Sequence, residues 1–290
     1  MIKNVLLIGH KSFVGSEFRK SIINKDNLNL FFLDRYFLEE DILSLSKKDF
    51  IKKYFSLFEN IDAIVSCLHV HKKKFDQELE VNIKVYENIL YFAKIKKIKK
   101  IIYLSSVNVS KNKSSSYAYI KYQIEDLFSS CDNSIIIRPS FIISIDNNKN
   151  LLGGRDGASF KIFEKFFNYN LPIPIIGDGK YLFTYCFLKD LSNLMLFLLE
   201  DNTFVNKKIN FFSGEFLNFT SFIDSIAKIK NKKKYKVYLP FLFVRVLFKL
   251  KILDHKNIDN LLNQRIYYNY YYLLKKKISI KQLLTMDKKR

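Results

Sequence analysis

Cysteine is scarce in this chain of 290 residues, which contains only Cys67, Cys131 and Cys186. An odd number of scattered cysteines excludes a disulfide framework and is typical of a reduced, cytoplasmic protein. Long apolar runs are lacking as well, because the run Tyr238–Val244 is followed by basic residues and is too short to cross a bilayer. We therefore expect no transmembrane segment. Residues 238–253 are expected to form an amphipathic helix that packs on the core or lies against a membrane face.

Nucleic-acid-binding motifs are also missing, although the chain is strongly basic. Its 49 Lys and Arg residues against 28 Asp and Glu give a formal net charge of +21. Such a positive charge could promote binding to nucleic acid, to an anionic membrane surface or to a phosphorylated substrate. The lysines are dispersed, with runs at Lys94–Lys100 and Lys232–Lys236, and no zinc-finger, helix-turn-helix or RNA-binding pattern accompanies them. We expect a solvated lysine-rich surface and no nucleic-acid partner.

Short apolar runs alternate with helical patterns through the first 140 residues. The runs have the length and composition of buried parallel strands, and they are Val5–Ile8, Leu30–Leu33, Ala63–Val65, Lys100–Leu104 and Ser134–Ile137. Helical patterns fall between them at about 12–22, 73–95 and 117–130. This alternation predicts an α/β fold, namely a doubly wound parallel sheet with right-handed crossovers.

The regular alternation of strand-like runs and helical patterns ends after residue 140. Six of the eight glycines and three of the four prolines lie beyond that point. Leu171–Gly179 predicts an extended segment followed by a turn. Helices are expected at about 158–169, 189–200 and 218–229. We predict a smaller, less regular α+β region here, with some elements of 180–215 returning to the first sheet.

Glycine is nearly absent from the first 150 residues, where its two occurrences both follow the first predicted strand, in Gly9-His10-Lys11-Ser12-Phe13-Val14-Gly15. Gly9 suits a tight turn, and Gly15 lets the next helix pack close to the strand. The N-terminus of that helix would face the pyrophosphate of a dinucleotide. Ser12 stands where a third glycine is usual, so an ordinary strand–turn–helix is the alternative. The predicted contacts to the dinucleotide are Gly9, Ser12, Phe13, Val14 and Gly15.

An acidic residue ends the second predicted strand. Asp34 lies near the position at which an acid receives the ribose hydroxyls in NAD sites. Arg35 follows, and an arginine there can favour a 2′-phosphate instead. The choice between NAD and NADP therefore stays open, with NAD preferred, and a solvent-exposed Asp34 in a loop is the alternative.

A tyrosine and a lysine four residues apart, Tyr117 and Lys121, carry the candidate chemistry. The chain is rich in both residues and contains four such pairs. Only this one follows a strand that ends in Ser105-Ser106 and lies downstream of a glycine loop. Tyr117 opens a predicted helix and Lys121 lies one turn on, on the same face. An adjacent ammonium would make the tyrosine hydroxyl a better base, whereas the alternative is a capped helix with surface Tyr and Lys.

The order of these motifs resembles the extended short-chain dehydrogenase/reductase family, in its NAD-dependent epimerase/dehydratase branch, over nearly the whole chain. Asp41-Ile42 is similar to that family's adenine-contacting pair, and Val81–Leu90 to the helix that supplies a structural Asn, here Asn82. Leu104–Ser106 resembles the strand of the catalytic serine. Four further segments also resemble these enzymes: Arg138-Pro139, Pro172–Gly179, Tyr185–Leu191 and Ser213-Gly214.

The resemblance implies a Rossmann-type NAD(P)-binding domain over residues 1–150 and a region over 151–290 that mainly binds substrate. It implies NAD as cofactor, with NADP as the alternative, and a nucleotide-sugar substrate in the synthesis of surface-polysaccharide precursors. Its catalytic residues would be Ser106, Tyr117, Lys121 and Asn82. Ser106 would hold the substrate, Tyr117 would carry the proton, and Lys121 would orient the ribose. A homodimer is one option for the assembly.

The resemblance also narrows the reaction to hydride transfer at a sugar carbon, C4. Dehydratases of this family place an Asp-Glu pair just after the catalytic Ser or Thr, whereas Val107-Asn108 follows Ser106 here, so dehydration is not expected. A C4 epimerase and a 4-keto reductase of a nucleotide-deoxysugar both stay open. A non-catalytic dinucleotide-binding sensor or structural module is a further alternative.

Two arginines and three histidines complete the candidates. Arg155 and Arg265 could bind the substrate diphosphate, because a guanidinium matches phosphate oxygens, and surface ion pairs are the equal alternative. His10, His69 and His71 show no metal-ligand spacing with acids or cysteines, so we expect no metal. His69 follows the third predicted strand, near where a nicotinamide would lie, and a packing role is expected for it.

Overall fold

The computed structural model describes residues 2–23, 25–33, 41–56, 58–112, 115–145, 151–153, 161–201, 204–212, 217–233, 235–240 and 243. The chain divides into two compact units. Unit 1 contains Met1–Pro139 and Lys189–Phe211, and unit 2 contains Ser140–Leu188 and Phe212–Arg290. The assignment of cofactor to the first part of the chain and substrate to the second stays a prediction.

Unit 1 is built on a six-stranded parallel sheet with the order β11-β5-β4-β3-β1-β2. The strands are β1 (Asn4–Ile8), β2 (Asn29–Leu33), β3 (Ala63–Ser66), β4 (Lys100–Leu104), β5 (Ser134–Pro139) and β11 (Lys207–Phe211). From β1 the chain goes to the edge strand β2 and then returns to β3 on the other side of β1. The loops after β1 and β3 therefore diverge at a switch point, where such sheets bind ligands. The predicted doubly wound Rossmann-type sheet is confirmed.

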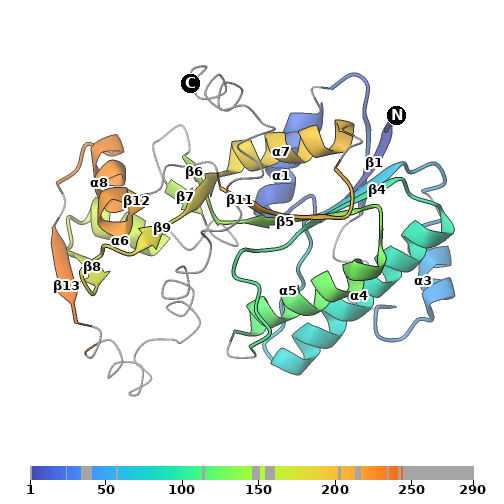
Figure 1. Ribbon diagram of the computed structural model, residues 1–290, viewed down its shortest axis with the longest axis horizontal. Helices are drawn as coiled ribbons and strands as arrows, with labels where there is room; N and C mark the ends of the chain where they lie inside the picture. The colour runs from blue at the N-terminus through green and yellow to red at the C-terminus, as the bar shows by residue number, and fades with distance from the viewer. Residues whose placement is uncertain are drawn as a thin grey trace. The chain divides into compact units, whose positions relative to one another are not determined.

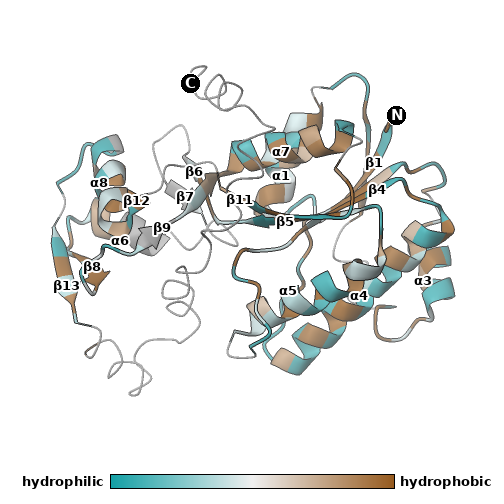
Figure 2. Cartoon of the chain, in the orientation of Figure 1, coloured by the Kyte–Doolittle hydropathy of each residue, from teal (hydrophilic) through white to brown (hydrophobic). Residues whose placement is uncertain are grey.

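Helices cover both faces of this sheet (Figure 1). Among the described residues, α1 (Phe13–Ile23) and α7 (Leu188–Glu200) lie on one face. The helices α3 (Lys47–Tyr54), α4 (Phe75–Ile95) and α5 (Ser116–Leu127) lie on the other, and a short 3-10 turn, η1 (Phe128–Ser130), follows α5. Hydrophobic and hydrophilic residues both occur along α4 and α7 (Figure 2). In α4 the apolar residues spaced at helical intervals, Val81, Val85, Ile89 and Phe92, are all buried against the core. Burial of these faces drives the docking of the helices.

Lys100, the first residue of β4, is only 2% exposed. Its Nζ donates to the carbonyls of Leu198 at 2.7 Å, Leu199 at 3.3 Å and Asp201 at 2.6 Å. Leu198 and Leu199 lie in the last turn of α7 and Asp201 follows the helix, so these carbonyls lack acceptor roles within it. The negative end of the helix dipole also stabilises a cation at this position. Burial lowers the pKa of Lys100. The expectation that the whole run Lys94–Lys100 is solvated is therefore wrong at its last residue, which fixes α7 to the sheet.

Unit 2 is made of short elements around a core of its own. Its strands pair as β10-β6-β7, β12-β9 and β13-β8. They are β6 (Phe141–Ile145), β7 (Leu151–Gly153), β8 (Ile173–Ile176), β9 (Leu182–Phe183), β10 (Tyr185–Phe187), β12 (Leu217–Asn218) and β13 (Lys236–Leu239), and the helices are α6 (Lys161–Asn168) and α8 (Phe219–Ile229). The core gathers residues from these strands and from α8, among them Ile175, Tyr185 and Phe222. Unit 2 is thus an α+β body, as the sequence predicts.

The helix expected over residues 238–253 begins with a strand instead. Tyr238 and Leu239 belong to β13, which pairs in parallel with β8 in the register Tyr238↔Ile175 and Leu239↔Ile176. Extended pairing satisfies the backbone groups of both segments at once, and that outweighs a weak helical pattern. Most of the rest of that segment lies outside the described residues. Among the residues that the structure describes, no helix is long and apolar enough to cross a membrane.

Candidate functional site

The loop Gly9–Ser12 joins β1 to α1 in a tight turn. Gly9 has a φ of +83°, a conformation that side chains rarely adopt, and a Cβ on it would lie 3.0 Å from the backbone N of Leu68. A Cβ on Gly15 would lie 2.2 Å from the carbonyl oxygen of Gly9. The two glycines therefore let α1 begin directly against the end of β1, and the N-terminus of α1 opens at the switch point of the sheet.

Ser12 occupies the middle position of this loop. Its backbone N–H donates to the Gly9 carbonyl at 3.0 Å, and its Oγ accepts from the backbone N–H of Gly15 at 3.0 Å. This is the arrangement of a helix N-cap, which satisfies one of the first-turn donors of α1. The serine that departs from the usual glycine thus has a structural role in this chain.

The loop after β3 is held by two buried side chains of α4. Asn82 is fully buried, and its Oδ1 accepts from the Val70 N–H at 3.0 Å while its Nδ2 donates to the carbonyls of Val70 and Glu78, both at 2.7 Å. One turn further on, the hydroxyl of Tyr86 donates to the Leu68 carbonyl at 2.8 Å. The amide of Asn82 is therefore engaged with the backbone, so Asn82 shapes the site rather than offering a reacting group.

Tyr117 and Lys121 lie on the first two turns of α5, whose N-cap is Ser115. The Lys121 ammonium donates to the Leu104 carbonyl at 2.8 Å and lies 5.8 Å from the centre of the Tyr117 ring. Lys121 is 3% exposed, and burial lowers its pKa to about 7. The Tyr117 ring also meets the imidazole of His69 edge-on, with centroids 5.0 Å apart. The structure thus brings Tyr117, Lys121, the end of β4 and the loop after β3 together.

The two serines after β4 differ in their contacts. Ser106 is buried, and its Oγ accepts from the Asn108 N–H at 3.2 Å. The hydroxyl of Ser105 instead donates to Oε1 of Glu125 at 2.5 Å. Glu125, one turn after Lys121 on α5, is 2% exposed and also binds the guanidinium of Arg138 through both of its oxygens. This network connects α5 to the ends of β4 and β5 and so sets where Tyr117 and Lys121 lie relative to Ser106.

The remaining predicted residues are less accessible to a ligand or fall outside the described part of the chain. Ile42 is 2% exposed and belongs to the core. Asp41 pairs with Lys53 at 2.5 Å and accepts a hydrogen bond from Tyr54. Their predicted contact with adenine stays a prediction. Four predicted binding residues, Asp34, Arg35, Arg155 and Arg265, lie outside the described residues, as does Ser213-Gly214.

Sequence reasoning missed a cluster beside Tyr117 that consists of His69, His71 and Glu78. Nε2 of His69 and Nδ1 of His71 lie 2.9 Å and 3.2 Å from the same oxygen, Oε1 of Glu78. Burial lowers the pKa of His69 to about 3. The two histidines are spaced as i and i+2, but the acid comes seven residues later in another element. One signal in the sequence was available: Glu78 lies in the first turn of the helix that also carries Asn82, and this places Glu78 near the loop after β3.

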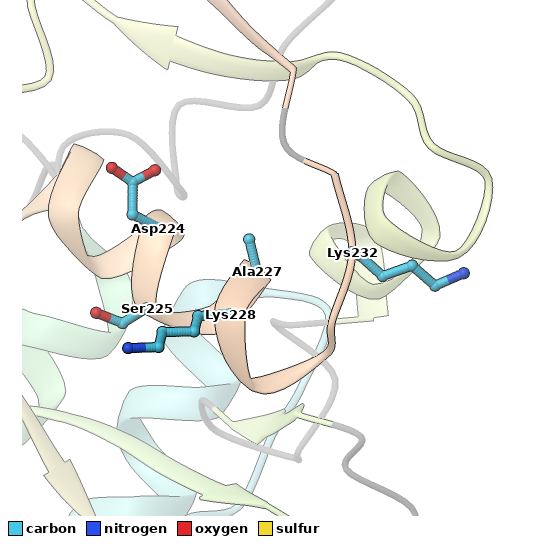
Figure 3. A pocket seen from close by; sticks show the side chains of 5 residues that line it. All are labelled: Asp224, Ser225, Ala227, Lys228 and Lys232. Atoms are coloured by element: carbon cyan, nitrogen blue, oxygen red, sulfur yellow. The ribbon is translucent and has the colours of Figure 1, made fainter.

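A shallow hollow of about 410 Å³ in unit 2 is lined by Asp224, Ser225, Ala227, Lys228 and Lys232. Figure 3 shows the two lysine side chains extending in opposite directions, so their ammonium groups do not converge on one point. Asp224 is engaged by Lys236 at 2.5 Å. The hollow therefore offers no cradle for an anion, and the candidate chemistry stays with Tyr117 and Lys121.

Comparisons with known proteins agree with this fold. The sequence model of the NAD dependent epimerase/dehydratase family matches residues 5–211. A search of curated proteins by sequence found no match. The UDP-glucuronic acid 4-epimerase of Bacillus cereus, solved with NAD, is 20% identical with a TM-score of 0.63, covering 82% of this chain and 87% of that one.

Two further solved structures have the same architecture. The dTDP-4-dehydrorhamnose reductase of Bacillus anthracis, solved with NADP, is 14% identical with a TM-score of 0.63, covering 83% of this chain and 86% of its own. The UDP-glucose 4-epimerase of Thermotoga maritima, solved with UDP-glucose, is 16% identical with a TM-score of 0.59, covering 82% of this chain and 85% of its own. At these identities the structural likeness establishes the fold alone.

Proposed function

This chain belongs to the NAD-dependent epimerase/dehydratase family, and on that premise we propose that it is an NAD(P)-dependent enzyme acting on a nucleotide-sugar. The observation that carries the proposal is the proximity of the Tyr117 ring both to Lys121 and to His69 in the loop after β3, at the carboxyl end of the sheet. This edge also holds the glycine loop, and ligands of doubly wound sheets bind there. The cofactors of solved relatives, NAD and NADP, support the same assignment.

The residues present fit a dinucleotide. The turn at Gly9 and the close approach at Gly15 leave no room for side chains, as a backbone that contacts a pyrophosphate requires. We assign the pyrophosphate to the first-turn N–H groups of α1 at Phe13 and Val14, because the helix dipole favours an anion there. Lys121 would exchange its bond to the Leu104 carbonyl for the ribose hydroxyls. When bound, the cofactor supplies the hydride chemistry that amino-acid side chains lack.

The remaining steps fall to residues of the chain itself. Ser106 holds the reacting oxygen of the sugar by a hydrogen bond. Tyr117 takes the proton from that hydroxyl when it is oxidised, or gives one to the carbonyl when it is reduced. The Lys121 ammonium next to the Tyr117 ring stabilises the phenolate that forms when the proton leaves. Asn82 acts through the loop it clamps.

The same residues serve an epimerase at C4 and a 4-keto reductase. A dehydratase is disfavoured, because Val107-Asn108 stands where those enzymes carry an acid and a base. An epimerase returns hydride to the sugar and so retains its cofactor oxidised, whereas a reductase consumes a reduced cofactor in each turnover. The solved relatives include both kinds.

Two measurements test the proposal. Mass spectrometry of the denatured, freshly purified protein identifies any cofactor that copurifies, and retained NAD favours the epimerase. Incubation with UDP- and dTDP-linked sugars and 4-keto sugars, with and without NADH or NADPH, then reveals epimers or reduced products by chromatography. Dinucleotide binding without turnover across the whole panel would instead support a non-catalytic binding module.

A further inference from the structure

We propose that His69, His71 and Glu78 form a binding site for a divalent transition-metal ion beside Tyr117. The ligating atoms of the three side chains all lie within 4.8 Å of one another. Nothing in the proposed reaction uses His71 or Glu78. The site is therefore a separate property of this chain.

The distances suit an ion of this class. Oε1 of Glu78 lies 2.9 Å from Nε2 of His69 and 3.2 Å from Nδ1 of His71. Zinc binds nitrogen and oxygen ligands at about 2.0–2.2 Å, which places neighbouring ligand atoms of a tetrahedral site about 3.3 Å apart. Small rotations of the three side chains would admit the ion, and each neutral imidazole would then carry its proton on the ring nitrogen that faces away from the ion.

The frame that carries these ligands is already rigid. Val70, the residue between the two histidines, has both its N–H and its carbonyl bound by the amide of Asn82. The same amide nitrogen donates to the carbonyl of Glu78. One buried side chain thus fixes the backbone of all three ligands, so little conformational entropy is lost when they converge on an ion.

The protonation states also favour binding. Burial keeps the pKa of His69 at about 3, so its imidazole is neutral near pH 7. Burial raises the pKa of Glu78, but the hydrogen bonds from the two histidines lower it by more, so Glu78 is a carboxylate. A neutral imidazole and a carboxylate can bind a metal ion without first releasing a proton to solvent.

Two imidazoles and one carboxylate select the class of ion. Zinc, cobalt, nickel and iron(II) accept this mixed set, whereas magnesium and calcium prefer oxygen ligands throughout. The His71 side chain is 28% exposed, which gives a route of entry, and the His69 side chain is only 7% exposed.

Metal binding to tag-free protein tests the site without any assay of turnover. The protein is equilibrated with Zn²⁺ or Co²⁺, separated from free ion by gel filtration, and measured by plasma mass spectrometry and by the visible spectrum of bound Co²⁺. The variants are Glu78→Gln and His71→Ala. Glu80→Gln is the matched control, because Glu80 lies two residues along α4, is exposed and pairs with Lys84.

We expect about one equivalent of ion in the wild type and in Glu80→Gln, and affinity lowered roughly ten-fold or more in both ligand variants. Circular dichroism and the binding of NAD(H) check that each variant is folded. If Glu78→Gln fails to fold, His71→Ala tests the proposal, because the His71 side chain is partly exposed and its removal disturbs the core less. A wild type that retains no ion, or ligand variants that bind like the wild type, would overturn the proposal and leave the proposed enzyme function untouched.

Discussion

Nζ of Lys121 donates a 2.8 Å hydrogen bond to the carbonyl of Leu104, the last residue of β4. This bond ties the second turn of α5 to the end of the strand that leads into Ser105 and Ser106. The ammonium also lies 4.7 Å from the centre of the Tyr103 ring. A buried cation with one carbonyl and two aromatic faces as neighbours is poorly hydrated, and its charge is correspondingly easy to remove.

Lys121 is therefore expected to titrate near pH 7, far below an ordinary lysine. Burial lowers its pKa to about 7, although Cys67 and Glu125 oppose that shift. Because the unfolded chain binds this proton up to about pH 10.4, the penalty of burying the charge is complete below pH 7 and is relieved as the pH rises towards 10. NMR of the ¹³Cε-labelled lysines should show one resonance titrating near neutrality that Lys121→Met removes. Titration of every lysine above pH 9 would contradict the expectation.

Tyr117→Phe should lower turnover by roughly 100-fold to 10,000-fold, the usual contribution of a general acid–base group. Cofactor affinity, measured by NADH fluorescence, should change little, because the ring and its contact with His69 are kept. Tyr119→Phe is the control, since Tyr119 lies on the same helix and packs against Phe75. Turnover that survives in Tyr117→Phe, or falls equally in Tyr119→Phe, would remove Tyr117 from the mechanism.

The sequence predicts the sheet of unit 1 well because buried parallel strands appear as continuous apolar runs. Four of the five predicted runs match the observed strands to within one residue at either end, and β5 extends the fifth run to Pro139. Much of α4 is predictable for a similar reason, since its apolar residues recur at helical spacing over 21 residues. The strands β9 and β12 are two residues long, too short to show any period.

The candidate site is less predictable than the sheet, because its contacts are made between elements. The buried ammonium of Lys100 looks like one more surface lysine in the sequence, and only the end of α7 explains it. Glu78 and His69 are nine residues apart, with a loop between them, and their contact follows from the way Asn82 clamps that loop. The types and the order of the residues were enough to predict the roles of Tyr117 and Lys121. The hydrogen bonds that surround them join separate elements, so they could be identified only in the structure.

Gly15→Ala should weaken cofactor binding and destabilise the protein. The new Cβ would lie 2.2 Å from the Gly9 carbonyl oxygen, so α1 must move away from the end of β1. Such overpacking costs about 1–3 kcal/mol or more. Ser16→Ala, one residue further along α1, adds no atom and should leave NADH affinity unchanged. Normal affinity and a normal urea midpoint in Gly15→Ala would show that the turn is looser than the structure indicates.

Glu125→Ala should destabilise unit 1 strongly. Glu125 is 2% exposed and accepts hydrogen bonds from Ser105 and from Arg138, so its removal leaves the Arg138 guanidinium without the carboxylate that compensates its charge. Loss of one partner of a buried pair costs about 3–5 kcal/mol, which a urea titration would measure. Asp126→Ala is the control, because the neighbouring Asp126 is exposed and a surface change of that kind stays within about 0.5 kcal/mol.

Glu125→Gln separates stability from positioning. An amide keeps an oxygen for the Ser105 hydroxyl but lacks the charge that Arg138 matches, so the end of β4 stays attached to α5 while the ion pair is lost. If the network positions Ser106 relative to Tyr117, kcat on the true substrate should fall much less in Glu125→Gln than in Ser105→Ala combined with Glu125→Gln. Equal kcat in the single and double variants, both folded, would restrict the network to a purely structural role.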